Sequence, residues 1–191
     1  MQTDKKFIMQ IGVMTLIAFL IGLGISGLIW GLKPARVYEA KVYENKDLHL
    51  KFSYLDLYFL TEEKKATTSR LFLLADTKEN RDIVSFGNIK TDDLSGAIFI
   101  ESFERNGFVD IAEWVKSNTK QSHFDSSNPN IETALVDDKK IVSYNWSDHL
   151  EGNTLAFINE GRVYLFTVAS SNESDRIYKD FVSLVSTLEL I

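Results

Sequence analysis

An uncharged run of 26 residues, Phe7 to Leu32, limits most strongly what this chain can fold into. Within it only Gln10, Thr15 and Ser26 are neither apolar nor glycine. A helix rises about 1.5 Å per residue, so about 20 residues cross a hydrocarbon core of about 30 Å. We therefore expect a transmembrane helix at residues 7–32, preceded by a short basic tail at residues 1–6.

The alternative for this run is a cleaved signal peptide, because Lys5 and Lys6 precede it and Gly24-Ile25-Ser26 resembles a cleavage site. A signal peptide has an apolar region of about 7–15 residues, whereas this run continues to Leu32, which favours an uncleaved anchor. Basic residues lie on both sides of the run, so their distribution does not decide its orientation. Because a basic tail before an apolar segment is typical of a signal-anchor, we expect a single-pass protein of the cell membrane with its C-terminal domain extracytoplasmic.

Small residues recur every four positions in the run, at Ala18, Gly22 and Ser26. Residues four apart lie on one helix face, and a face of small residues lets two helices approach closely in lipid. This pattern predicts weak self-association through Ala18, Gly22 and Ser26. The alternative is that glycine is simply frequent in membrane helices.

The remaining residues, 33–191, are numerous enough for one compact domain. We expect a linker at residues 33–44, whose end suits an early strand around Lys41 to Tyr43, and the domain at residues 45–191. Residues 33–191 contain 19 basic and 26 acidic residues, a formal net charge of −7, which disfavours nucleic acid as a partner. The chain has no cysteine, which excludes disulfides, thiolate nucleophiles and cysteine metal sites.

Apolar and polar residues alternate from Leu48 to Tyr54, as in a strand with one buried face. Other runs are rich in β-branched or aromatic residues. The further expected strands are Arg70–Ala75, Asp82–Phe86, Ala97–Phe103, Ile131–Val136, Ile141–Trp146, Asn153–Ile158 and Arg162–Ala169. The last two are joined by Asn159-Glu160-Gly161, which predicts an antiparallel hairpin with a loop of three to five residues. Because both faces of residues 162–169 are apolar, this strand is predicted to be central.

Two helices are expected to cover the sheet. Asp110 and Glu113 resemble a capping box, followed by an apolar stripe of Ile111, Trp114 and Val115. A second stripe, with its start capped by Ser174 or Asp175, has helical spacing. Its members are Ile177, Phe181, Leu184, Val185 and Leu188. The polar stretch from Ser117 to Asn130 predicts a long exposed loop.

Four segments in this order resemble the PsbP-like domains over about residues 45–190. They are Asn45–Tyr54, Asp110–Val115, the hairpin at Gly161–Tyr164 and the closing helix at Phe181–Leu188. The resemblance implies an antiparallel sheet sandwiched by helices. The best-known members of the family are extrinsic subunits of photosystem II that help retain calcium and chloride, and many bacterial relatives are membrane-anchored or lipidated. This chain has Tyr54-Leu55 where such domains often have Tyr-Pro, and a fold alone does not transfer a function.

Motifs for phosphate loops, nucleophile elbows, zinc helices and calcium loops are all absent from the sequence. Asp148, His149 and Glu151, beside Trp146, would suit an acid-base site, but we expect a solvated turn. Two acidic pairs would suit calcium, but as pairs they are more typical of exposed turns. These pairs are Asp92-Asp93 and Asp137-Asp138. Trp114 and Trp146 would suit a docking surface, but their positions favour the core.

The sequence therefore predicts an α+β fold, an antiparallel β-sheet flanked by helices on both faces, as in the PsbP-like α/β/α sandwich, preceded by one transmembrane helix. We expect a non-catalytic binding or accessory domain for a membrane complex or envelope component. The partners are then the lipid bilayer through residues 7–32 and a membrane or envelope protein. The alternatives are a small-ligand or calcium-like ion sensor, and a hydrolase using Asp148, His149 and Glu151. No catalytic, cofactor-binding or metal-binding residue is assigned.

Overall fold

The computed structural model describes residues 37–64, 67–85, 96–126, 130–136, 139–147, 151–170 and 175–191. The predicted transmembrane helix at residues 7–32, with Ala18, Gly22 and Ser26, lies outside these residues. Within the part that is described, no helix has both the length and the apolar character needed to cross a bilayer. The described residues form two compact units, one with the residues up to Asp56 together with Val182–Ile191, the other with Leu57–Phe181.

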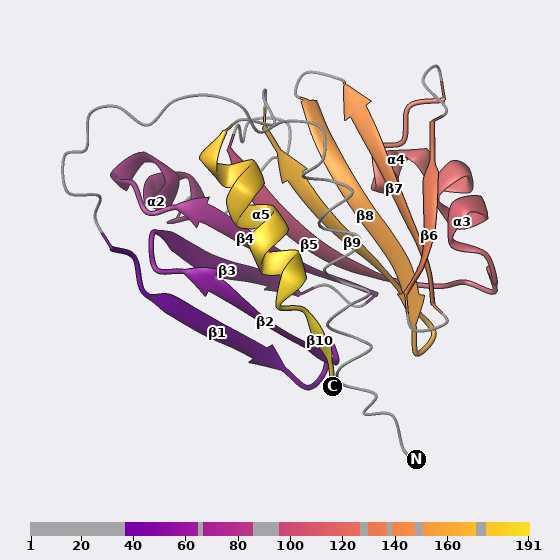
Figure 1. The fold of residues 1–191 in the computed structure, drawn as a ribbon, viewed down its shortest axis with the longest axis horizontal. Coiled ribbons are helices and arrows are strands. Elements are labelled where there is room, and N and C mark those ends of the chain that lie inside the picture. The colour runs from indigo at the N-terminus through magenta and orange to yellow at the C-terminus, as the bar shows by residue number, and fades with distance from the viewer. Residues whose placement is uncertain are drawn as a thin grey trace, which may run out of the picture. The chain divides into compact units, whose positions relative to one another are not determined.

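The first unit contains a three-stranded antiparallel sheet in the order β1-β2-β10 (Figure 1). Its strands are β1 (Ala40–Asn45), β2 (Leu50–Leu55) and β10 (Glu189–Leu190). Leu50 and Phe52 are buried, which confirms the one-sided strand predicted there. β1 begins inside the segment assigned to the linker at residues 33–44, so ordered pairing starts at Ala40. The boundaries of the domain themselves stay predictions.

The C-terminus is held in this sheet by bonds that the sequence pattern did not predict. The Ile191 amide donates to the carbonyl of His49 over 3.1 Å, and the His49 ring nitrogen Nδ1 lies 2.9 Å from the Ile191 carbonyl oxygen. Lys51 forms an ion pair of 2.9 Å with Glu189. Because β10 has only two residues, these long-range bonds, rather than a local pattern, define it as a strand.

The second unit contains a seven-stranded antiparallel sheet in the order β3-β4-β5-β9-β8-β7-β6. Its elements are β3 (Tyr58–Lys64), β4 (Thr68–Ala75), α2 (Lys78–Ser85), β5 (Ala97–Glu104), α3 (Ile111–Ser117), α4 (Thr119–Ser122), β6 (Glu132–Val136), β7 (Lys139–Ser147), β8 (Glu151–Asn159), β9 (Arg162–Ala169) and the start of α5 (Arg176–Ser186). β9 lies in the middle of the sheet and is almost completely buried, which confirms its predicted central place. β3 is a strand that the sequence analysis missed, because its charged second half hides the apolar alternation.

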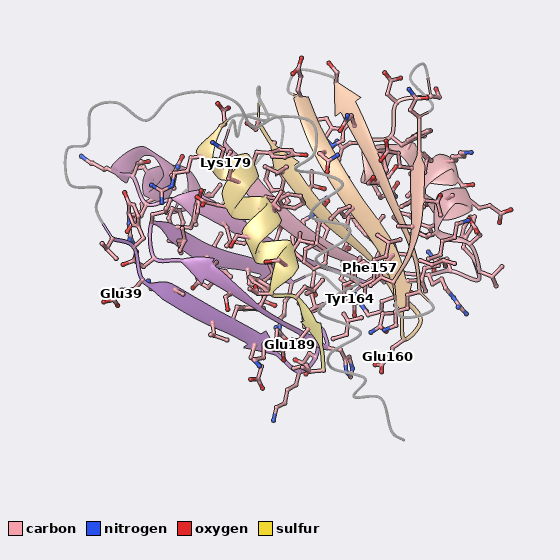
Figure 2. All side chains as sticks on the ribbon, viewed as in Figure 1. Glu39, Phe157, Glu160, Tyr164, Lys179 and Glu189 are labelled. Carbon is pink, nitrogen blue, oxygen red and sulfur yellow. The ribbon has the colours of Figure 1, made fainter. Side chains whose placement is uncertain are left out.

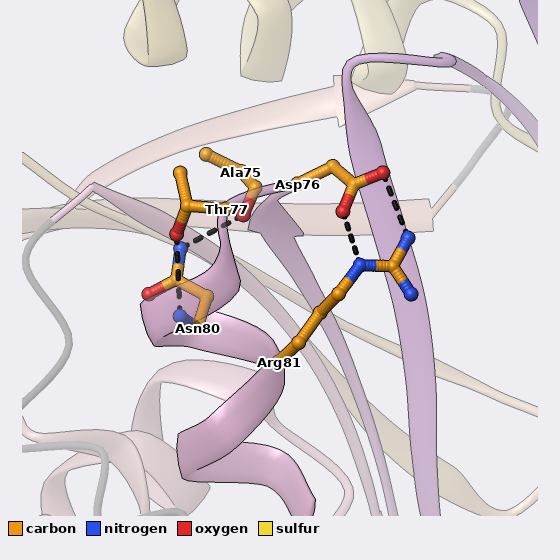
Figure 3. A network of polar contacts seen from close by, with 5 residues as sticks. All are labelled: Ala75, Asp76, Thr77, Asn80 and Arg81. Atoms are coloured by element: carbon orange, nitrogen blue, oxygen red, sulfur yellow. Dashed lines mark hydrogen bonds and ion pairs between the residues drawn. The ribbon is translucent and has the colours of Figure 1, made fainter.

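The strand predicted at Asp82–Phe86 is wrong, because residues up to Ser85 belong to helix α2. A polar network starts this helix (Figure 3). The Asn80 amide donates to Thr77 Oγ1 over 3.2 Å, and Asn80 Nδ2 donates to the carbonyl of Ala75 over 2.8 Å. Arg81 donates to both carboxylate oxygens of Asp76. These caps stabilise a helix start and override the β preference of the two β-branched residues that follow.

Helix α3 begins as predicted, with Asp110 as its N-cap. Asp110 Oδ1 accepts from the amides of Ala112 and Glu113 over 2.8 and 3.1 Å. The stripe of Ile111, Trp114 and Val115 is buried. These three side chains belong to one core cluster with Phe99, Ala156 and Leu165, so α3 packs on the sheet face that those strand residues share.

The long exposed loop predicted at residues 117–130 is wrong in its first half. Residues Thr119–Ser122 form α4, and both Ser122 and Phe124 are buried. Ser122 Oγ donates to the carbonyl of Val115 over 2.9 Å, and the Phe124 ring packs against Tyr144 with 5.5 Å between ring centroids. Ser122 can be buried within this otherwise largely exposed polar stretch because its hydroxyl group finds a partner inside the fold.

The predicted hairpin between β8 and β9 is confirmed, but its loop is shorter than expected. Asn159 pairs with Arg162, so only Glu160 and Gly161 form the turn. Their φ angles are +48° and +79°. Two-residue hairpins of type I′ require positive φ at both positions, which glycine adopts without strain and glutamate does not.

In helix α5 the predicted apolar stripe is confirmed in its first part. Ile177, Phe181 and Leu184 are buried, and Val185 is half-buried. The helix ends at Ser186, so Leu188 lies beyond it. The side chain of Tyr58 on β3 donates a hydrogen bond of 2.8 Å to Asp180 Oδ2, which fixes the first turns of α5 to the edge of the seven-stranded sheet.

Candidate functional site

The residues proposed for an acid-base site are not brought together by the described structure. Asp148 and His149 lie outside the described residues, and Glu151 is exposed at the start of β8. The acidic pairs Asp92-Asp93 and Asp137-Asp138 also lie outside them. Within the described ranges, no group of three or more His, Asp or Glu residues could hold a metal ion.

Both tryptophans weighed as docking residues belong to the core, as expected. Trp114 and Trp146 are only 2% and 8% exposed. The Trp146 ring lies so close to the backbone of β8 that a Cβ atom at Gly152 would come within 2.3 Å of it. Glycine is therefore needed at this strand position, because every other residue would clash with the indole.

The most unusual group in the described core is a carboxylate, Glu101 on β5, which is 2% exposed. Arg70 lies directly opposite on β4, and its Nε atom is 2.6 Å from Glu101 Oε1. On the other side of Arg70, β3 places Glu63 in register. One cation therefore lies between two carboxylates in a row across three strands, with Glu101 at the buried end.

Arg70 lies close to Glu101 but does not form a hydrogen bond of good geometry with it. Among the described residues, none donates such a hydrogen bond to Glu101 Oε1. Burial raises the pKa of Glu101 from its ordinary 4.5 to about 7. The charge of Arg70 acts in the opposite direction but does not offset the burial, and Glu63 raises the pKa slightly further. Glu101 therefore exchanges its proton near neutral pH, which is uncommon for a carboxylic acid.

A chain of buried hydroxyl groups crosses the same core cluster. Trp146 Nε1 donates to Thr154 Oγ1 over 3.1 Å, and the hydroxyls of Thr154 and Thr167 are 2.9 Å apart. The Tyr144 hydroxyl donates to the carbonyl of Ser122 over 2.8 Å, and burial raises the pKa of this phenol. These groups satisfy one another inside the fold, so the chain of bonds is a structural network.

His123 lies where this network approaches the surface. Its ring stacks on Trp146 with 5.2 Å between ring centroids, and its backbone adopts the left-handed conformation, with φ +55°. The Trp146 indole thus packs against both the His123 ring and the β8 backbone at Gly152. This stack fixes the start of the loop that follows α4.

The sequence analysis missed the Arg70–Glu101 pair, although a signal was present. In the apolar run Ala97–Phe103, the period of two places Glu101 on the same face as Phe99 and Phe103. A carboxylate on the buried face of a strand is expected to have a cationic partner, because an unpaired buried charge is costly. The neighbouring strand β4 provides this partner, Arg70. What the pattern could not give is which strand lies beside β5.

Comparison with known proteins tests the fold. No protein-family model matches the chain, and no curated protein matches it. The chain is similar to the solution structure of cyanobacterial PsbP from Synechocystis sp. PCC 6803, with 13% sequence identity, a TM-score of 0.52, and coverage of 89% of this chain and 99% of that one. A crystal structure from Bacteroides thetaiotaomicron has 12% identity and a TM-score of 0.39, covering 79% of this chain and 48% of that one. The described elements, mostly antiparallel strands with few helices, therefore form a PsbP-like fold.

Proposed function

We propose that this chain is a membrane-anchored, non-catalytic accessory protein that binds a partner in a membrane complex or envelope component, with its C-terminal domain outside the cytoplasm. The observation that carries the proposal is a PsbP-like fold placed after an uncharged run of 26 residues. One solved structure with a similar fold is that of a cyanobacterial PsbP. The run is long enough to span a bilayer with some tilt, and the folded domain would be held beside it.

The finer architecture belongs to the same proposal, with helices on both faces of the seven-stranded sheet. α3 shares a core cluster with Val163 and Leu165 of β9. The alternate residues of β9 point to the opposite face, where Tyr164 stacks on Phe157 with 5.2 Å between ring centroids (Figure 2). The hydrogen bond from Tyr58 to Asp180 supports α5 as the cover of this second face.

The described polar groups support binding rather than catalysis. Glu101, the carboxylate with the most perturbed pKa, is enclosed in the core, where a substrate has no access. Perturbed carboxylates are also found in structural ion-pair networks, and the row of Glu63, Arg70 and Glu101 has that form. The form of this row therefore favours a structural ion-pair network over a catalytic site.

The test is membrane association and topology of the full chain with a C-terminal epitope after Ile191. We expect the protein to stay in membranes after alkaline carbonate extraction, and protease added to intact cells or spheroplasts to digest the epitope. The variant Leu20→Arg/Leu23→Arg, which places two charges in the run, should be released. The matched control Leu135→Arg changes a residue of β6 that is 76% exposed and should behave as the parent.

Release of the unmodified chain by carbonate would refute the anchor, and an epitope protected until lysis would place the domain in the cytoplasm. The ion-sensor alternative is separated by calcium titration of the same preparation. Under the proposal, calcium leaves the melting temperature unchanged. A melting temperature that rises and saturates at micromolar calcium would instead support the ion-sensor function and refute the accessory function.

A further inference from the structure

Strand β1 forms an outer edge of the three-stranded sheet (Figure 1). Among the described strands it pairs with β2 alone. Ala40, Lys41 and Val42 are all exposed, and the apolar side chain of Val42 is 62% exposed. Natural edge strands are protected against pairing by proline, bulges, inward charges or charged edge side chains, lysine above all. Strand β1, Ala-Lys-Val-Tyr-Glu-Asn, has no proline and no bulge in its register with β2, and of these devices it carries only the charges of Lys41 and Glu44.

The backbone bonds of this sheet show which groups of β1 point outward. The Asp56 amide donates to the carbonyl of Glu39 over 2.8 Å, so residue 39 faces β2. On the other side of β2, the Ile191 amide donates to the carbonyl of His49, so residue 49 faces β10. Alternation along β2 from this residue agrees with the pairing of residue 39 with β2. Antiparallel pairing alternates along a strand, so the amides and carbonyls of Ala40, Val42 and Glu44 point away from β2.

We propose that β1 pairs antiparallel with β1 of a second copy of this chain, with Val42 on the twofold axis. In this register Val42 faces Val42 of the second copy, and Ala40 faces Glu44 on either side of the axis. All three outward-pointing residues of each copy then exchange hydrogen bonds, about six in total. The two sheets join into one sheet through an interface in which each copy contributes the same residues.

The side chains of β1 fit this register. The two Val42 side chains cover each other on one face. On the other face Lys41 lies opposite Tyr43, whose ring is held against Phe52 with 5.1 Å between ring centroids, so the ammonium group meets an aromatic face. No two like charges lie opposite each other. If Glu44 were on the axis instead, two glutamates would face each other, which is destabilising.

The inference goes beyond the proposed function, since the register needs only β1 and no membrane. A membrane anchor would assist it, because seven residues, 33–39, separate the expected membrane helix from β1. Such a tether spans at most about 25 Å, so two anchored copies would meet at high effective concentration.

Disulfide crosslinking of the full chain tests the register, because the parent chain has no cysteine. Val42→Cys should give a crosslinked dimer under mild oxidation, since opposite Cα atoms are about 5.5 Å apart, within the range for disulfides. Val37→Cys, 90% exposed, should not, because the two copies of residue 37 would lie about 34 Å apart. Ala40→Cys and Glu44→Cys should each fail alone and crosslink when the two variants are mixed.

A second measurement uses mass in solution. Val42→Lys places two like charges on the axis and should convert the dimer to a monomer, measured by light scattering with detergent subtracted. Leu135→Lys, on the exposed edge strand β6, should leave the mass of the dimer unchanged. Equal melting temperatures would show that both variants fold.

The proposal is overturned if Val42→Cys fails to crosslink, or if Val37→Cys crosslinks as well as Val42→Cys does. It is also overturned if Val42→Lys keeps the dimer mass, which would assign the association to another surface. Loss of membrane association with an intact β1 crosslink would refute only the proposed function, so the two failures are distinguishable.

Discussion

Replacing Glu101 by glutamine removes the buried carboxylate of β5 and keeps its shape. In the parent protein this carboxyl has a pKa of about 7, compared with 4.5 for an ordinary glutamate. Burial is the main cause, because a charge in the core loses its hydration. The folded protein therefore holds the proton between pH 4.5 and 7, where the unfolded chain releases it.

The sign and size of the effect follow from this difference. Because the folded state binds more protons in that window, the free energy of unfolding falls as the pH rises from 4.5 to 7 and is level above pH 7. A difference of about 2.5 in pKa corresponds to about 3 kcal/mol, since one unit is worth about 1.4 kcal/mol. Glutamine has no proton to release, so Glu101→Gln should lose this part of the pH dependence.

The assay is urea unfolding of the full chain in mild detergent at pH 4.5, 6 and 8, followed by tryptophan fluorescence. Relative to Glu101→Gln, the parent should lose about 3 kcal/mol between pH 4.5 and 8. Glu63→Gln is the matched control, because Glu63 occupies the other, half-buried end of the same row. A parent-to-glutamine difference that stays constant with pH would refute the reasoning.

Three further predictions concern stability, measured by urea unfolding at pH 8. Gly152→Ala should destabilise the protein by about 1–3 kcal/mol, because its Cβ would meet the Trp146 ring at 2.3 Å. Asn153→Ala, at the half-buried neighbour, should change the stability less, and equal effects would contradict this prediction. Gly161→Ala should lower the free energy of unfolding by about 1–2 kcal/mol, since alanine is strained at φ +79°. Glu160→Asn should leave the stability unchanged or raise it, because asparagine suits a type I′ turn. The opposite order of the two variants would count against a type I′ turn. Asp110→Ala should lower the free energy of unfolding by about 1–2 kcal/mol, because it removes the cap of α3 and the ion pair with Lys140. Asp110→Asn keeps a capping oxygen and should recover much of this loss. If it recovers nothing, the loss belongs to the ion pair.

Local patterns were sufficient where a structure depends on neighbours in sequence. The cap of α3 could be predicted because Asp110 bonds to amides only two and three residues away. The buried face of β2 could be predicted because Leu50 and Phe52 alternate with polar residues. The central position of β9 followed from two apolar faces, since such a strand must be covered on both sides.

Local patterns failed where distant partners decide. The strand expected at residues 82–86 is a different case, a local signal that was overlooked, because a polar network of residues three to five apart in sequence starts a helix just before it. The polar stretch after α3 looks like a surface loop, yet Ser122 is buried because Val115 and Tyr144 supply its hydrogen-bond partners. β10 is too short to show any pattern, and its bonds to β2 define it.

The sequence by itself determined the uncharged run at residues 7–32, the net acidity of the rest and most strands, because each of these depends on composition or on a period of a few residues. Only the tertiary structure decided that Arg70 lies between Glu63 and Glu101, and that the outward groups of β1 are those of Ala40, Val42 and Glu44. Both arrangements depend on which strand lies beside which and in what register. Strand pairing joins residues far apart in the chain, and a period of two gives each strand its faces but not its neighbours.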